Sequence, residues 1–134
     1  MKELIDDTDN TLQSIIDKVK EVDGVDIELV HTNGSGGIRP EGLPPHYDNG
    51  FKVDGVFKYH MKWCMYSASV LDTNDYDGGE FVFLTDDDEV VAEYGKEEHY
   101  KKILIFSIDN KHMVRPTTRG DRIARLFFFK KIDP

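Results

Sequence analysis

The sequence has only one cysteine, Cys64, among its 134 residues. An internal disulfide is therefore excluded, and a reducing compartment is expected. No apolar run approaches the roughly 18 residues that a membrane-spanning helix needs. The stretch Met1 to Asp9 is acidic and polar, unlike the basic and then apolar start of a secretory signal. These absences predict a cytoplasmic protein without a membrane partner.

Basic residues are also scarce, because 17 Lys and Arg stand against 26 Asp and Glu and give a formal net charge of −9. A chain with this charge repels both a nucleic acid backbone and an anionic membrane surface. We therefore expect no nucleic acid partner. Hydrophobic residues make up 39% of the chain, enough for one core and too little for two. We predict a single domain over residues 1–134.

One segment has the periodicity of an amphipathic helix. Asn10 stands at the expected N-cap, with Gln13 three residues later as in a capping box, and Gly24 provides a stop signal. These signals predict one N-terminal helix over about residues 11–22. The apolar residues that recur at helical spacing are Leu12, Ile15, Ile16, Val19 and Val22.

The rest of the chain, about residues 26–130, is predicted to form a β core, so that the fold class is mainly β. Short segments rich in Val, Ile, Phe and Tyr are separated by clusters of Gly, Asn and Asp. About eight strands result, the number that a double-stranded β-helix, or jelly roll, requires. The predicted strands are Asp26–His31, a short one ending near His46–Asp48, Tyr59–Leu71, Gly79–Leu84, Glu89–Tyr94, Lys102–Ile108, His112–Pro116 and Arg122–Phe129.

The segment His46-Tyr47-Asp48 is a His-x-Asp pair. In an extended segment, residues two apart point to the same side, so His46 and Asp48 can contact one metal ion. Such pairs also arise by chance, and the pair alone does not establish a site. His112 begins a late predicted strand and can bring a second imidazole to the same place in a jelly roll. Two histidines and one carboxylate leave one face of the metal open, as in non-haem Fe(II) oxygenases.

Arg122 begins the last predicted strand, and Ala124, Leu126 and Phe128 alternate behind it. An arginine on an apolar, inward-facing side needs a carboxylate partner. A diacid cosubstrate would supply that carboxylate. A local acid such as Asp109 is the alternative, and the spacing does not decide between the two.

From Pro45 to Pro134 the sequence resembles the double-stranded β-helix core of 2-oxoglutarate- and Fe(II)-dependent oxygenases. Within that superfamily it is most similar to the prolyl hydroxylase branch, and in particular to the collagen prolyl 3-hydroxylase catalytic domain. The motifs occur in order and with compatible spacing. They are Pro45-His46-Tyr47-Asp48-Asn49, Tyr66-Ser67-Ala68, the stretch Tyr76 to Phe83, Phe106-Ser107, Asn110-Lys111-His112 and the stretch Thr118 to Arg122.

The resemblance implies that His46, Asp48 and His112 bind Fe(II), and that Arg122 pairs with the distal carboxylate of 2-oxoglutarate. It also implies oxidative decarboxylation of 2-oxoglutarate to succinate, coupled through O₂ to hydroxylation of a substrate C–H. Ascorbate is a further candidate cofactor. The substrate implied is a prolyl residue in a peptide or protein.

Two serines of the predicted strand Tyr59–Leu71 are weaker site candidates. Ser67 and Ser69 share a face and can donate to the cosubstrate, although small residues also serve simply to pack a barrel. Where the prolyl hydroxylases carry a tyrosine that helps to hold 2-oxoglutarate, this chain has Leu71, which leaves that contact to another residue. The remaining histidines have no second ligand at strand spacing in the sequence and are expected on the surface or in packing roles: His31, His60 and His99.

The segment Thr32–Pro45 holds four glycines and three prolines among fourteen residues, which predicts a surface loop without regular structure. Because it leads directly into His46, we expect a mobile lid over the metal site, with a peptide bound beneath it. The alternative function is a catalytically silent, metal-binding jelly roll that acts as a sensor or binding module. The presence of both the metal triad and Arg122 favours the enzyme.

Overall fold

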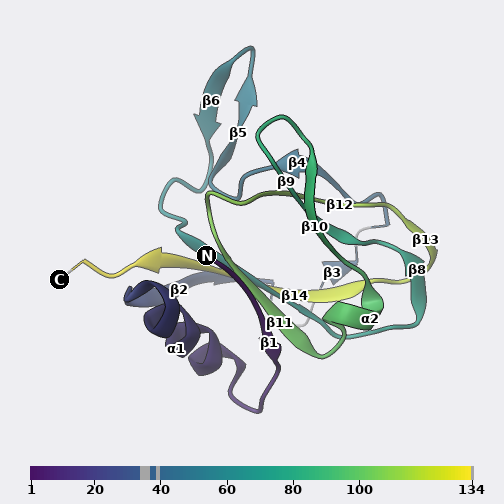
Figure 1. The fold of residues 1–134 in the computed structure, drawn as a ribbon, viewed down its shortest axis with the longest axis horizontal. Coiled ribbons are helices and arrows are strands. Elements are labelled where there is room, and N and C mark those ends of the chain that lie inside the picture. Colours follow the sequence, from purple (N-terminus) through teal and green to yellow (C-terminus); the bar gives the residue numbers. More distant parts are fainter. Residues whose placement is uncertain (34–36, 39, 134) are drawn as a thin grey trace.

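The computed structural model describes the chain except for residues 34–36, 39 and 134, and except for the side chains of residues 37, 38 and 51–53. The fold is mainly β, with two antiparallel sheets and one N-terminal helix (Figure 1). The predicted double-stranded β-helix is therefore confirmed. Within the described part of the chain, neither helix has the length and apolar character that a bilayer crossing requires.

Helix α1 (Thr11–Asp23) matches the predicted helix to within one residue. Ile15 and Val19 on its apolar side are fully buried. The helix ends at Gly24, which has the left-handed conformation with φ of 69° and donates its N–H to the carbonyl of Lys20 at 3.0 Å. The predicted stop signal is thus confirmed.

The predicted capping box of α1 is wrong. Asn10 makes no side-chain hydrogen bond to the first turn. The Gln13 amide instead donates to Asp17 at 2.8 Å, one turn further along the exposed face. Because the Gln13 amide makes this (i, i+4) hydrogen bond, it is not available to complete a capping box with Asn10.

The larger sheet lies next to α1. Its strands are β1 (Lys2–Asp6), β2 (Ile27–Thr32), β3 (Gly37–Ile38), β7 (Tyr66–Leu71), β11 (Lys102–Ser107) and β14 (Ile123–Lys131). They follow the order β1-β11-β7-β14-β2, and β3 also pairs with β14. One face of this sheet packs against α1 through alternate residues such as Tyr66, Ala68 and Val70 of β7.

The smaller sheet covers the other face of the larger one. Its strands are β4 (Leu43–His46), β9 (Phe81–Leu84), β10 (Val90–Tyr94) and β12 (Lys111–Val114). They follow the order β10-β9-β12-β4. Phe81 and Phe83 of β9 pack against Leu104 and Phe106 of β11, so a second apolar cluster fills part of the space between the sheets.

Three small elements complete the fold. Strand β8 (Tyr76–Gly78) pairs with β13 (Thr117–Gly120), and the short helix α2 (Lys96–His99) follows β10. Strands β5 (Gly50–Val53) and β6 (Val56–Tyr59) form a hairpin that stands out from the body at the top of Figure 1.

The single strand predicted over Tyr59–Leu71 is wrong. Strand β6 ends at Tyr59, the chain turns where the N–H of Cys64 donates to the carbonyl of Met61 at 2.9 Å, and β7 begins only at Tyr66. The apolar and aromatic run contains no Gly, Pro, Asn or Asp, so no residue in it signals the break. The sequence analysis also missed the N-terminal strand β1, which extends the larger sheet through its pairing with β11.

The loop expected over Thr32–Pro45 contains regular structure. Its first residue ends β2, and the segment includes β3 and most of β4. Backbone pairing with β12 and β14 overrides the low β propensity of glycine and proline here. Residues 34–36 and 39 lie outside the described residues, so the expected mobility of this segment stays a prediction.

Gly42 lets β4 approach β12 closely, and replacing it should weaken that pairing. A Cβ at Gly42 would lie 2.3 Å from the Val114 carbonyl oxygen, and φ there is +73°. We expect Gly42→Ala to lower the free energy of unfolding by about 3 kcal/mol or more. Gly55, at φ +78° with nothing within 4 Å of an added Cβ, is the matched control, and Gly55→Ala should cost about 1 kcal/mol. Urea unfolding followed by circular dichroism measures both, and equal losses would contradict this account.

Candidate metal centre

The two histidines of the site face each other across a strand pair. His46 ends β4 and His112 lies in β12, and the antiparallel register places these two residues directly opposite one another. Directly opposed residues in such a pair project from the same face with their Cβ atoms roughly 5 Å apart. The imidazole centroids are accordingly 4.3 Å apart.

Asp48 reaches the histidines from a turn and not from a strand. Tyr47 and Gly50 exchange backbone hydrogen bonds at 3.2 and 3.1 Å, so Asp48 lies in the tight turn that joins β4 to the hairpin. The expected extended geometry of the His-x-Asp pair is therefore wrong, although the two side chains still meet. The turn folds the carboxylate back toward the end of β4.

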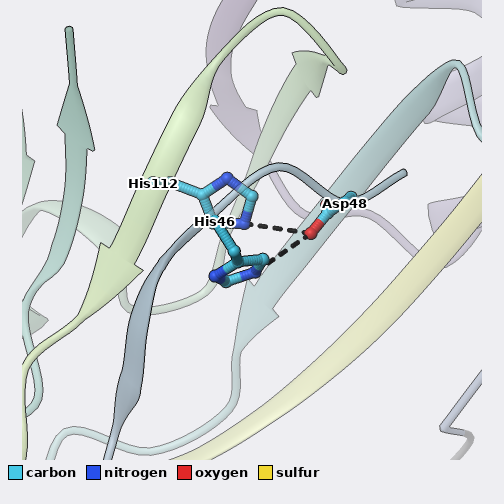
Figure 2. Close-up of side chains that lie close together, drawn as sticks. All are labelled: His46, Asp48 and His112. Atoms are coloured by element: carbon cyan, nitrogen blue, oxygen red, sulfur yellow. Dashed lines mark ion pairs between the residues drawn. The ribbon is translucent and has the colours of Figure 1, made fainter. Parts of the chain in front are cut away.

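The three side chains converge on one point. The Nε2 atom of His112 lies 3.1 Å and that of His46 lies 3.3 Å from the same carboxylate oxygen, Oδ1 of Asp48. Figure 2 shows both rings turning a nitrogen toward that oxygen. All three donor atoms lie within 4.8 Å of one another, a spacing that one metal ion can bridge.

Backbone hydrogen bonds set the orientation of both rings. Nδ1 of His46 donates to the Pro44 carbonyl at 2.7 Å, and Nδ1 of His112 donates to the Asn110 carbonyl at 3.0 Å. In the neutral imidazoles, the Nε2 lone pairs then face Asp48. Two nitrogen lone pairs and a carboxylate oxygen together repel one another unless a cation lies between them. The donor set and the hydrogen bonds behind it thus fit a divalent transition metal.

The carboxylate of Asp48 is held in its ionised form. Burial alone would raise the pKa of Asp48, because Asp48 is only 6% exposed. When a proton takes the place of a metal ion on Nε2, the His112 ring attracts the carboxylate, and hydrogen bonds from His112, His46 and Ser67 add to this attraction. Together they outweigh burial and set the pKa of Asp48 far below its usual range. A metal ion would therefore meet a negative ligand across the whole physiological pH range.

Aromatic rings wall the site on its inner side. The Phe81 ring stacks on His112 with a centroid distance of 5.2 Å, and Phe106 meets the same imidazole nearly edge-on at 4.8 Å. These contacts fix the plane of His112 and keep water from its inner face. Both phenylalanines belong to motifs that carry the resemblance, but neither was assigned a role, because inward-facing aromatics are ordinary in any sheet.

A cavity of about 640 Å³ opens beside the metal ligands. It is lined by both sheets, with His46, Asp48 and His112 on one side and the inner face of β14 on the other. Strand β14 contributes Ala124, Leu126 and Phe128, and Arg122, which directly precedes the strand, continues the predicted alternation. The exposed His31 and His60, which were expected on the surface or in packing, lie at the mouth of this cavity, whereas His99 is fully buried.

Arg122 has no carboxylate partner among the described residues. None of the ion pairs between those residues includes Arg122, and its buried Nε atom makes no hydrogen bond to them. The proposed local partner, Asp109, instead accepts a hydrogen bond from Ser107. Burial lowers the pKa of Arg122, and the Tyr76 hydroxyl partly offsets this effect. A half-buried arginine with an enclosed Nε atom and no acid favours a ligand carboxylate as its partner.

The two candidate serines differ in their surroundings. The Ser67 hydroxyl interacts with Asp48 and lies 3.6 Å from the Cys64 sulfur, so it supports a metal ligand. The Ser69 hydroxyl, on the same face of β7, is buried in the cavity wall without a hydrogen-bond partner among the described residues. Of the two, Ser69 is the better placed to contact a ligand. Leu71 is fully buried.

The triad makes a direct prediction about metal affinity. Replacing His46, Asp48 or His112 by Ala should raise the Kd for Mn(II) at least about hundredfold, because each removes one of three protein ligands. His31→Ala, which changes a histidine at the mouth of the same cavity, is the control and should leave the Kd unchanged. Isothermal titration with Mn(II) measures each Kd. Unaltered binding in two of the three triad variants would place the metal elsewhere.

Comparisons with known proteins bear on the fold. No protein-family model and no curated protein sequence matches this chain. An oxidoreductase of the 2OG-Fe(II) oxygenase family from Burkholderia pseudomallei matches 79% of this chain and 46% of its own, with a TM-score of 0.53 and 16% identity. A Pseudomonas putida prolyl-4-hydroxylase matches 92% of this chain and 65% of its own, with a TM-score of 0.57 and 19% identity.

The chain thus spans less than two thirds of the length of either structure. At these identities the likeness establishes the fold alone. Neither structure bears on the collagen prolyl 3-hydroxylase branch, which stays a prediction. The chain has the fold of the 2OG-Fe(II) oxygenases, including that of a bacterial prolyl 4-hydroxylase, and carries a candidate His-Asp-His iron site within it.

Proposed function

We propose that this protein is a 2-oxoglutarate- and Fe(II)-dependent oxygenase that hydroxylates a prolyl residue in a peptide or protein. One observation carries the proposal. A His-Asp-His cluster and an arginine without an acid partner among the described residues line the same cavity. The first suits a metal ion, and the second suits the carboxylate of a small diacid.

The residues of the metal centre have separate tasks. His46, His112 and Asp48 would hold Fe(II) on one face, which leaves the cavity side open for 2-oxoglutarate and O₂. The bound metal and cosubstrate would supply two reactions: the oxidative decarboxylation of 2-oxoglutarate to succinate and CO₂, and the oxidation of a substrate C–H bond. Phe81 and Phe106 would exclude water from the inner side of the centre. Ascorbate would serve only to keep the iron reduced.

Arg122 would hold the other end of the cosubstrate. Its guanidinium can grip a carboxylate with two parallel hydrogen bonds, a geometry that a lysine ammonium cannot reproduce. Ser69, on the neighbouring strand β7 of the same sheet, supplies a buried hydroxyl to the wall of the same cavity. Together they would orient 2-oxoglutarate along the cavity with its keto acid end toward the metal ligands.

The mouth of the cavity supports a polypeptide substrate. The exposed Pro44, His31 and His60 stand at its rim, and the β5–β6 hairpin begins two residues after Asp48 and ends directly before His60. Val56 and Tyr59 on this hairpin are each 57% exposed. An open rim with exposed apolar side chains suits an extended peptide better than a free amino acid, which an enclosed site would bind.

Arg122 provides the first test of the proposed function. Arg122→Ala should raise the KM for 2-oxoglutarate about hundredfold, because two charge-assisted hydrogen bonds are lost. Arg122→Lys should recover only part of this loss, since a point charge replaces a planar fork. Succinate formation with added Fe(II), measured against 2-oxoglutarate concentration, gives each KM. An unchanged KM in the Ala variant would move the carboxylate contact to another residue.

Product analysis provides the second test. After incubation with Fe(II), 2-oxoglutarate and O₂, proline-containing peptides should gain one oxygen by mass spectrometry, while free proline should not. The Asp48→Ala variant is the control and should leave every peptide unmodified. Oxidation of a free amino acid with all peptides untouched would overturn the peptide assignment. Metal binding without any succinate formation would instead indicate a catalytically silent binding module.

A further inference from the structure

Four buried side-chain atoms lack a hydrogen-bond partner among the described residues. They are Ser69 Oγ, His99 Nδ1, Thr117 Oγ1 and Arg122 Nε. Buried polar atoms in native proteins are nearly always hydrogen-bonded, so each exception needs an explanation. Ser69 and Arg122 line the same cavity, and Thr117 lies near Arg122 at Gly79, which indicates that something polar belongs near this arginine.

The side chains of Arg122, Thr117 and Tyr76 all lie close to Gly79. A Cβ built on Gly79 would lie 2.9 Å from Cδ of Arg122, 3.2 Å from the Thr117 hydroxyl and 3.2 Å from the Tyr76 ring. The φ angle of Gly79 is also +64°, a conformation that residues with a side chain rarely adopt. The bare α-carbon thus forms a cradle in which Arg122 lies against both the tyrosine ring and the threonine.

Tyr76 is a close neighbour of Arg122. It is 1% exposed, and its ring lies against the same Gly79 surface as the Arg122 side chain. The phenol favours the charged arginine and so partly offsets the lowering of the Arg122 pKa by burial. The β8–β13 ladder anchors this tyrosine, because Tyr76 pairs with Gly120. Lys96 of α2 fixes it further by donating to the Tyr76 carbonyl at 2.7 Å. The phenol therefore holds the arginine from outside the cavity.

Ser69 and His99 close the other side. The Ser69 carbonyl accepts a hydrogen bond from His99 Nε2 at 2.9 Å, which fixes the backbone of β7 at this point. Burial lowers the pKa of His99 to about 4, so this imidazole is uncharged at neutral pH. Arg122 is then the positive charge at this end of the cavity, and the Ser69 hydroxyl in the cavity wall remains available to a ligand.

We infer that Tyr76 positions Arg122, and that Ser69 adds the second contact, for the distal carboxylate of 2-oxoglutarate. Tyr76, which comes from β8, thereby takes over the task of the tyrosine that the resemblance places at Leu71. The inference rests on the proposed function. It explains why Arg122 has no acid partner among the described residues, because the neighbouring phenol and the ligand carboxylate would together supply its polar contacts.

The inference is tested by comparing the affinity of the protein for two ligands that have the same number of chain carbons. 2-Oxopentanoate has the keto acid end and the chain length of 2-oxoglutarate but lacks the distal carboxylate. Isothermal titration of the Mn(II)-loaded protein gives a Kd for each, and their ratio isolates the carboxylate contact. We expect a ratio of at least about a hundred in the original protein. Tyr76→Phe and Ser69→Ala should each reduce this ratio about tenfold and leave the Kd of 2-oxopentanoate unchanged.

Two controls separate the possible causes. Tyr94→Phe removes the hydroxyl of a tyrosine that packs against Phe83, outside the cavity lining, and should not alter the ratio. Thermal unfolding of each variant checks that the fold is intact, and the two site variants lie on different strands, so they test the inference independently. A strong preference for 2-oxoglutarate that neither variant reduces would overturn the inference and leave the proposed function standing. Failure of both acids to bind would overturn the proposed function itself.

Discussion

The antiparallel register of β4 on β12 is the constraint on which the site depends. It places His46 opposite His112 and so brings two imidazoles, 66 residues apart in sequence, within contact distance of one another. The register in turn requires Gly42, because a side chain there would overlap the Val114 carbonyl. Strand β12 also pairs with β9 on its other edge, which presents Phe81 to His112. One pairing thus sets both the distance between the metal ligands and the apolar wall behind them.

Charge is distributed in two different ways in this acidic protein. On the surface, arginines find carboxylates: Arg115 pairs with Glu93, Arg119 with Asp77, and Arg125 with both Asp72 and Asp7. Such exposed pairs contribute little to stability, and they leave a large excess of acids facing solvent. Inside the cavity the order is reversed. Arg122 has a buried Nε atom and no acid partner among the described residues, while Asp48, the one buried carboxylate among them, is held by two histidines. An anion that enters the cavity therefore moves from a negatively charged protein surface to a positively charged inner end.

Sequence periodicity identified the parts of this fold that local patterns determine. The helix and the inward face of β14 follow from the spacing of apolar residues, and the His-x-Asp pair with a late histidine was visible as a candidate cluster. Pairing between strands that are distant in sequence determined the features that the sequence patterns did not predict. Strand β1 has no distinctive pattern and exists because β11 offers it an edge. The turn at Asp48 and the position of Tyr76 beside Arg122 both depend on contacts between distant segments, and neither has a local signal. The resemblance pointed to a missing tyrosine at Leu71, but it could not indicate which strand would supply another.

The three candidate metal ligands are not held with equal rigidity. His46 and His112 lie in a sheet whose strands β12 and β9 are paired along their length, and each ring is tied to a backbone carbonyl two residues away. Asp48 depends on the turn between Tyr47 and Gly50, which leads into a two-stranded hairpin outside both sheets. An isolated hairpin is only marginally stable by itself, so its base gains order from what it contacts. The Tyr47 ring, which packs against Phe57 and whose hydroxyl donates to Asp86, is one such contact. The carboxylate ligand is therefore the part of the site whose position depends on the hairpin at the mouth, where a substrate would bind.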